Sequence, residues 1–259
     1  MSNSEVVEDF GARRVRSNRR TKTAMTVAQR IVEEISRKQY RPGTKLPAER
    51  EMLAKYAVGR GTLRESLRFL EMNGVLTVKP GPGGGPVVAE ADAHDLAGTL
   101  GLFLELHRTP FGAILEVRET LEPAIARLAA ERVTDQQIEL IAASVEDMAK
   151  DLDDVDLFLE ENEHFHTLVA KAAGNPVFSM LIESLNLITD GTRLGVGFPL
   201  ERRRHVLKAH RGILNAIQAR DPEAAANAMG AHVHEFRRYT DRHFPTAVSQ
   251  PLRWVDIAP

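Results

Sequence analysis

Cysteine is absent from this chain of 259 residues, and aromatic residues are scarce, with one tryptophan and three tyrosines. Without cysteine the protein can form no disulfide bond and can use no thiol as a nucleophile. No stretch approaches the roughly 20 apolar residues that a membrane-spanning helix needs. The first residues also lack the apolar run of a signal peptide. We therefore expect a cytoplasmic protein with no membrane partner.

The two ends of the chain differ in charge. Residues 1–90 contain 17 Lys plus Arg against 10 Asp plus Glu, whereas residues 91–259 contain 17 against 26. The net charge of −2 is therefore the sum of +7 in residues 1–90, the front of the chain, and −9 in residues 91–259, the back. Such a front favours a polyanion such as DNA in a salt-dependent manner, and the acidic back should be repelled by it.

Length and composition predict two domains, one at residues 25–90 and one at 91–244. The preceding residues 1–24 contain six basic residues and almost no apolar periodicity, which is typical of a disordered arm. The arm either grazes DNA or only solvates the chain. Residues 245–259 are interpreted as a tail, and the sequence reveals no role for it.

Residues 46–76 have the pattern of two short helices around a tight turn. Apolar residues recur at helical spacing up to a corner at 57–59, and a second helix begins near Arg60. The inward residues of this second helix are Leu63, Leu67 and Leu70. Arg60, Thr62 and Arg64 lie on its outer side or its exposed start, where arginine can reach guanine and threonine can reach a base edge or a phosphate. The alternative is an ordinary solvated face.

Further elements complete a winged helix-turn-helix. An apolar stripe formed by Val27, Ile31 and Ile35 predicts a third helix that covers the pair. Residues 75–79 and 86–88 read as two strands, and the glycine-rich residues 81–85 form the tip between them. Three helices and a β-hairpin make this DNA-binding fold.

The front domain resembles the GntR family of bacterial regulators. The resemblance is carried by RPGTKLPAER at 41–50, by VGRGTLRESLRFLEMNGVL at 58–76 and by the glycine-rich wing. It implies that Arg50, Arg60 and Arg64 contact DNA, with Thr62 as a fourth candidate. Gly59 stands where the family has a small hydroxyl residue.

The wing has no side chain that could read a base. We expect its Gly83 and Gly84 to approach the minor groove or the backbone through main-chain amides. Lys79, at the end of the first wing strand, is placed to hold a phosphate.

The back domain is predicted to be all-helical, so the whole fold is mainly α. Apolar residues recur at three and four in seven segments: 96–106, 114–132, 135–152, 156–173, 177–189, 202–219 and 222–244. This antiparallel bundle resembles the FCD effector and dimerisation domain of the FadR subfamily over about 92–244. The motifs stand at 117–134, 162–178 and 210–232.

Four residues of this domain form a candidate site for a divalent metal. Asn162 and His166 are four apart and share a helix face, while His210 and His232 sit among inward-pointing apolar residues of later helices. Imidazole suits zinc or nickel, and the open coordination positions would accept a carboxylate effector. The resemblance implies the same set with an acidic residue at position 162. Because Asn162 offers only a neutral carbonyl oxygen, the site holds zinc, nickel, another metal or none. Each histidine could otherwise be a hydrogen-bonded core residue.

Two arginines are candidates to bind the carboxylate of an effector. Arg118, on the first long helix of the back domain, can form a bidentate pair with a small acid or a salt bridge with Glu122, four residues on. Arg193, in the glycine-rich loop 191–197, is the second candidate.

The sequence therefore predicts a regulator and not an enzyme. A homodimer would read a pseudo-palindromic site in double-stranded DNA, and a small organic acid would modulate binding, with repression as the default and activation left open. One alternative is a hydrolase, in which the histidine-bound metal activates water. No carboxylate stands beside the histidines as a general base except Glu163, whose helical spacing points it to another face. Another alternative is a DNA-organising protein whose back domain only dimerises.

Overall fold

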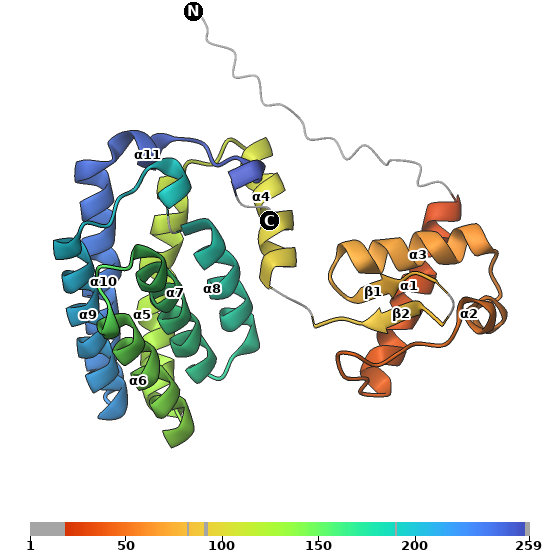
Figure 1. Cartoon of the computed structure of the whole chain (residues 1–259), viewed down its shortest axis with the longest axis horizontal. Helices are drawn as coiled ribbons and strands as arrows, with labels where there is room; N and C mark the ends of the chain where they lie inside the picture. Colours follow the sequence, from red (N-terminus) through yellow and green to blue (C-terminus); the bar gives the residue numbers. More distant parts are fainter. Residues whose placement is uncertain (1–18, 82, 91–92, 190, 257–259) are drawn as a thin grey trace, which may run out of the picture. The chain divides into compact units, whose positions relative to one another are not determined.

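The computed structural model describes residues 19–81, 83–90, 93–189 and 191–256 (Figure 1). Backbone contacts divide the chain into two compact units, Met1–Asp92 and Ala93–Pro259. The first unit holds three helices and a two-stranded antiparallel sheet. Its elements are α1 (Arg19–Arg37), α2 (Glu49–Tyr56), α3 (Arg60–Met72), β1 (Leu76–Lys79) and β2 (Gly85–Val88). The winged helix-turn-helix is confirmed.

Helix α1 begins earlier than the sequence indicated. Residues 19–24 were predicted to belong to a disordered arm, and this prediction is wrong because they form the first turns of α1. Packing against α3 explains the difference, since Ala24 is buried and its carbonyl accepts a 2.8 Å hydrogen bond from the Ser66 hydroxyl. The rest of the predicted arm, residues 1–18, lies outside the described residues.

A buried carboxylate fastens α1 to α2. Glu34 forms ion pairs with Lys38 and Lys55 and accepts a 2.9 Å hydrogen bond from the Tyr56 hydroxyl. Hydrogen bonds from Lys38 and then Lys55 hold the pKa of the Glu34 carboxyl at about 2. The same neighbourhood raises the pKa of Tyr56, chiefly through burial of its hydroxyl.

The segment before α2 extends the wing. The backbone of 43–46 hydrogen-bonds to β2, through Gly43 to Val88, Val88 to Thr44, and Leu46 to Pro86. Lys45 forms an isolated bridge with Val87, and its ammonium donates to the carbonyl of Gly83 at the wing tip. The wing therefore rests on the segment that joins α1 to α2.

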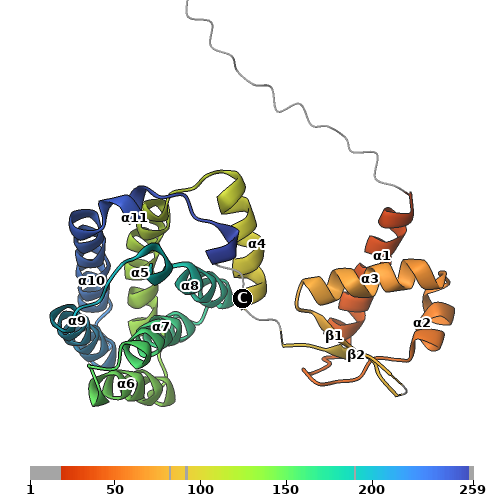
Figure 2. The ribbon, with the colours of Figure 1, turned by 45° about the horizontal axis from the view of Figure 1, so that its top comes forward.

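The second unit is a helical bundle. Its helices are α4 (Ala93–Leu106), α5 (Phe111–Arg132), α6 (Asp135–Lys150), α7 (Val155–Ala172), α8 (Pro176–Thr189), α9 (Leu200–Gln218), α10 (Pro222–His243) and α11 (Pro245–Ser249), with short 3-10 turns at Thr192–Leu194 and Trp254–Asp256. Helix α5 packs against α7, α8, α9 and α10 (Figure 2). The seven predicted helices are confirmed, each to within three residues at either end.

Side-chain caps mark three of these helix starts. Thr134 accepts from the backbone of Gln137 in a capping box, and Asp154 and Asp221 accept from the backbone three residues on. Each satisfies a backbone N–H that has no partner inside its helix. These are positions at which the sequence placed helix starts.

The C-terminal segment is part of the bundle. The sequence set residues 245–259 apart as a tail, but α11 and the residues after it pack on α4 and α5. Ala247 and Leu252 are buried, and backbone hydrogen bonds join Phe111 to Gln250 and Leu252 to Thr109. The apolar side chains explain the docking, which the prolines of this segment obscured in the sequence.

No helix among the described residues combines the length and the apolar character needed to cross a membrane.

Replacement of Glu34 by Gln should destabilise the first unit in a pH-dependent way. The lowered pKa means that the carboxylate stabilises the fold above about pH 4.5 and loses this effect as the pH falls toward 2. We expect Glu34→Gln to lower the free energy of unfolding by about 1–3 kcal/mol at neutral pH. Urea titrations followed by the methyl signals of Ile31 and Leu63 measure this unit alone.

The exposed neighbour Glu33 provides the control, because Glu33→Gln should leave the unfolding curves unchanged. A difference between wild type and Glu34→Gln that stays constant from pH 7 to pH 2.5 would contradict the assignment.

Candidate functional site

The outer side of α3 carries the candidate arginines of the first unit. Arg60 and Arg64 are exposed, Thr62 is half-buried, and the buried side of the same helix is formed by three leucines and Ser66. The N-cap residue of α3 is Gly59, which has no side chain. The first backbone N–H groups of the helix are therefore not capped by a side chain of that residue. The arrangement leaves cationic side chains and helix N–H groups on one surface, as binding of a phosphate backbone requires.

Arg50 lies next in the chain to a residue that contacts α3. It is exposed in the first turn of α2, and the residue before it, Glu49, forms a 3.3 Å ion pair with Arg64 of α3. This pair holds the starts of α2 and α3 together. The structure thus brings the start of α2, which carries Arg50, close to Arg64, although 14 positions separate the two arginines.

The wing tip depends on its glycines. Gly83 has φ of +81°, and a Cβ atom on Gly84 would lie 2.2 Å from the carbonyl oxygen of Lys79. Lys79 itself is exposed at the end of β1. Sequence reasoning missed Lys45, whose side chain holds the carbonyl of Gly83. Its place inside the motif at 41–50 was the available signal.

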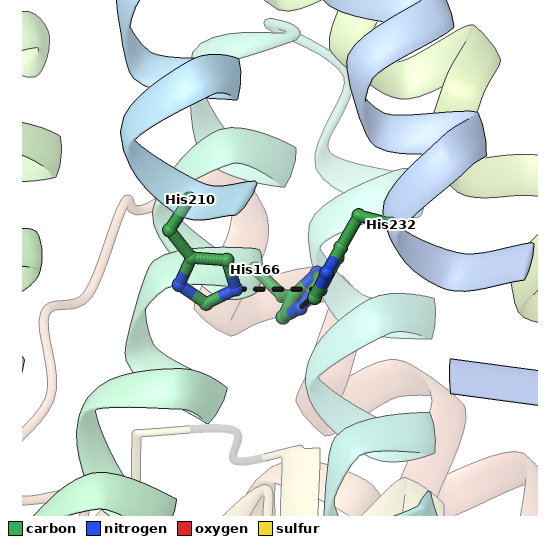
Figure 3. A group of neighbouring side chains, drawn as sticks. All are labelled: His166, His210 and His232. Atoms are coloured by element: carbon green, nitrogen blue, oxygen red, sulfur yellow. Dashed lines mark hydrogen bonds between the residues drawn. The ribbon is translucent and has the colours of Figure 1, made fainter. Parts of the chain in front are cut away.

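Three histidines meet inside the second unit. His166 comes from α7, His210 from α9 and His232 from α10, and at most 7% of each residue is exposed (Figure 3). The Nε2 atom of His232 lies 3.3 Å from Nε2 of His210 and 3.3 Å from Nε2 of His166. One nitrogen from each ring lies within 4.8 Å of the others. The three rings therefore turn ligand atoms toward a common point.

Burial keeps these imidazoles neutral. Desolvation lowers the pKa of all three, and the pKa values of His210 and His232 fall well below the ordinary value. Phe165 contributes to the apolar surroundings by stacking on the His210 ring at a centroid distance of 3.8 Å. Neutral imidazole is the form that ligates a metal.

A carboxylate orients His166 from behind. Glu122 on α5 lies 2.5 Å from Nδ1 of His166 and also pairs with Nε of Arg118. Burial would raise the pKa of Glu122, but the charge of Arg118 and the His166 ring hold it well below its usual range. A carboxylate this close to Nδ1 favours the tautomer with its proton on Nδ1, and that tautomer presents the lone pair of Nε2 to the other histidines.

The cluster fits a divalent metal. Two nitrogens bound at 2.0–2.1 Å to a tetrahedral ion lie about 3.3 Å apart, which matches both Nε2 separations. The carboxylate behind His166 is the usual outer partner of a metal-bound histidine. Asn162, one turn before His166 on α7, lines the cavity beside them. The residues present are thus suited to hold zinc or nickel.

The cluster opens into a partly enclosed cavity. His166 and His232 line one part of it, and apolar side chains line another: Leu159, Phe198, Val206, Val233 and Phe236. Asn162 and Asn186 add polar groups. A cavity with apolar walls and a few convergent polar groups is typical of a small-molecule site.

Two arginines line this cavity, and only one was predicted. Arg118 is in the wall, and it also forms the salt bridge with Glu122 that the sequence offered as the alternative. Arg202 on α9 is the second and was missed, because its helix start RRR at 202–204 looks solvated in sequence. Arg193 is exposed on the turn Thr192–Leu194 and does not line the cavity.

One carboxylate lies elsewhere than expected. Helical spacing pointed Glu163 away from the histidines, but this half-buried residue lines the cavity. Its neighbour in space is Asn186, which donates to the Glu163 carbonyl. The cavity extends around α7 farther than the single face that spacing describes.

Comparison with known proteins accounts for both units. The family described as "Bacterial regulatory proteins, gntR family" matches residues 23–84, and the family described as "FCD domain" matches residues 113–235. The chain is 32% identical over 219 residues to the HTH-type transcriptional repressor NanR of Citrobacter rodentium (strain ICC168), covering 83% of this chain and 84% of that protein.

A second relative and a solved structure agree. The uncharacterized HTH-type transcriptional regulator YcbG of Bacillus subtilis (strain 168) is 33% identical, with 83% of this chain and 88% of that protein covered. The structure of Streptococcus agalactiae GntR superposes with a TM-score of 0.69 at 30% identity, over 83% of this chain and 99% of that chain. With the winged helix-turn-helix and the helical bundle in place, the chain belongs to the GntR family of transcriptional regulators, as a FadR-type member with an FCD effector domain.

Proposed function

We propose that this regulator is a homodimeric repressor of a pseudo-palindromic operator, released by a small carboxylate that binds in the histidine-lined cavity. The observation that carries the proposal is the cluster of three neutral, buried histidines that opens into a cavity, in a chain whose other unit presents arginines at the start of α3. A dimer with two such helices would read two half-sites related by symmetry. Relatives named as repressors support the sign of regulation.

On the DNA side, the roles follow from exposure. Arg60 and Arg64 are placed to read base edges, and Arg50 and Lys79 to hold phosphates. Thr62, half-buried, contacts a phosphate or a base beside them. Gly83 and Gly84 bring the wing backbone close to the duplex because they carry no side chain that would hold it away.

On the effector side, His166, His210 and His232 would hold a zinc or nickel ion, and Asn162 would add a neutral oxygen ligand. When bound, the ion supplies a positive centre that accepts a carboxylate oxygen. Arg118 contributes its guanidinium to the cavity wall while it keeps Glu122 in place. The apolar wall excludes water from the bound acid.

Binding in the cavity would change DNA affinity only if the effector binds the two states of the protein with different affinity. Helices α5, α7, α9 and α10 all contribute to the site or its support. A ligand that draws them together therefore acts on the packing of the whole bundle, and through the dimer on the spacing of the two DNA-reading helices.

A genome-wide footprint of the purified full-length protein on DNA from its own organism, at physiological salt, tests this function. We expect a few sharp pseudo-palindromic sites. Arg60→Ala should weaken binding to such a site by roughly tenfold to a hundredfold, equivalent to 1–3 kcal/mol. Arg204→Ala, which removes an exposed arginine of α9, is the control and should leave the footprint unchanged. Diffuse, salt-labile binding alone would overturn the proposal in favour of architectural binding.

Gly84→Ala tests the wing. The added Cβ would meet the Lys79 carbonyl, so the tip must reshape at a cost of about 1–3 kcal/mol. We expect operator affinity to fall about tenfold or more while thermal unfolding of the FCD domain stays unchanged. Gly98→Ala, at a helical glycine with open space around it, should bind DNA as the wild type does. An unaltered operator affinity in Gly84→Ala would show that the wing makes no close contact.

Metal binding is tested by titration of the metal-free full-length protein with Zn²⁺, and with Co²⁺ as a spectroscopic probe. We expect one ion per chain, with tetrahedral Co²⁺ absorption that disappears in His210→Ala and persists in His164→Ala, since His164 is exposed on α7. Asn162→Asp should raise Zn²⁺ affinity about tenfold, or about 1.4 kcal/mol, by adding an anionic oxygen. Equal affinity in wild type and His210→Ala would contradict the site.

A further inference from the structure

Arg202 and Arg203 are both buried arginines of α9 with guanidinium nitrogens that lack a hydrogen-bond partner among the described residues, but only Arg202 lines the cavity. Only 4% of Arg202 is exposed, and its guanidinium lies over the rings of Tyr239 and Phe236 at 4.6 and 5.6 Å. One of its nitrogens, Nη1, pairs with Glu235, a mostly exposed side chain. The other two, Nε and Nη2, are buried and have no hydrogen-bond partner in the part of the chain that the structure describes.

This pattern differs from that of a structural arginine. A buried guanidinium whose donors lack partners forfeits the hydrogen bonds that it makes with water, at a cost of the order of 1–3 kcal/mol for each unsatisfied group. Nε and Nη2 form the side edge of the guanidinium, whose two parallel N–H bonds match a carboxylate. The aromatic rings and Glu235 fix the plane of the group and leave that edge without a partner.

Arg118 does not offer the same side edge. Its Nε is already paired with Glu122, and that carboxylate is shared with His166. Breaking this pair to bind an effector would leave Glu122 with less compensation for its buried charge, which is strongly unfavourable. Of the two arginines in the cavity wall, Arg202 is therefore the one whose Nε side edge is not already paired with a carboxylate.

Arg202 lines the same cavity as two of the histidines, His166 and His232. These two histidines, Arg202 and Arg118 provide the basic groups of its wall, and apolar side chains such as Val206 and Val233 lie among them. Two carboxylates, Glu160 and Glu163, also line the cavity, and Glu160 is exposed. A molecule that satisfies both basic sites needs an acidic group for each, joined by a short carbon chain.

We propose that Arg202 is a second anion-binding site in the effector cavity, and that the effector is a small acid with two carboxylates, one at the histidine cluster and one at the Nε and Nη2 edge of Arg202. This inference rests on the proposed function for the first carboxylate only. Burial of the second carboxylate against an otherwise unsatisfied guanidinium explains how the cavity would reject acids with a single charge.

Matched acids of equal chain length test the proposal by calorimetry on the full-length, zinc-loaded protein. The pairs are succinate with butyrate and adipate with hexanoate, which differ only in the second carboxylate. We expect at least one dicarboxylate to bind tenfold or more tightly than its partner. Arg202→Gln should remove this preference, whereas Arg204→Gln, two residues on and exposed, should keep it. Arg118→Gln should weaken both members of a pair alike.

A crystal structure of the wild type with the tighter dicarboxylate provides a readout that does not depend on the folding of a variant. We expect its second carboxylate within hydrogen-bond distance of Nε and Nη2 of Arg202. The proposal is overturned if neither dicarboxylate is preferred, if Arg202→Gln retains the preference, or if the acid leaves Arg202 without contact. Since the operator footprint does not involve these acids, sharp footprints together with any of these outcomes would refute this inference and leave the regulator itself standing.

Discussion

The buried carboxylate of Glu122 is the point on which the FCD domain is organised. An ionised group removed from water is strongly unfavourable unless charges and hydrogen bonds compensate for it. Arg118, on the same helix, and His166, on α7, provide that compensation. The pair with His166 joins α5 to α7 and favours the imidazole tautomer whose Nε2 lone pair faces His210 and His232. The orientation of the α7 histidine thus depends on a residue that belongs to neither the metal site nor the cavity wall.

The two arginines in the cavity wall, Arg118 and Arg202, differ in how their charges are paired. Arg118 is paired with the buried carboxylate of Glu122, so its charge mainly stabilises the fold. Arg202 is held by the exposed carboxylate of Glu235 and by two aromatic rings, which orient the guanidinium but give its Nε and Nη2 edge no hydrogen-bond partner. A binding protein can tolerate a buried guanidinium with unpaired N–H groups, because the ligand supplies the missing partner. The guanidinium has already lost its water on folding, so binding does not have to remove that water again.

Local pattern was sufficient for most of the fold. Helical periodicity located the bundle helices, and the glycine-rich tip between two short strands located the wing. The errors arose where tertiary packing overrides local composition. Residues 19–24 look like a solvated basic segment, yet α3 covers Ala24, and the proline-rich C-terminus docks through Ala247 and Leu252.

The sequence by itself determined that the chain is a winged helix-turn-helix joined to a helical FCD domain, and it singled out His166, His210 and His232, since motif and spacing are properties of the chain. Only the tertiary structure decided that Glu122 supports His166, that Lys45 holds the wing tip, and that Arg202 lines the cavity. Helical spacing gives the face of a residue within its own helix. Which face of another helix lies opposite depends on how α5, α7, α9 and α10 pack, and that packing is set by the whole core together.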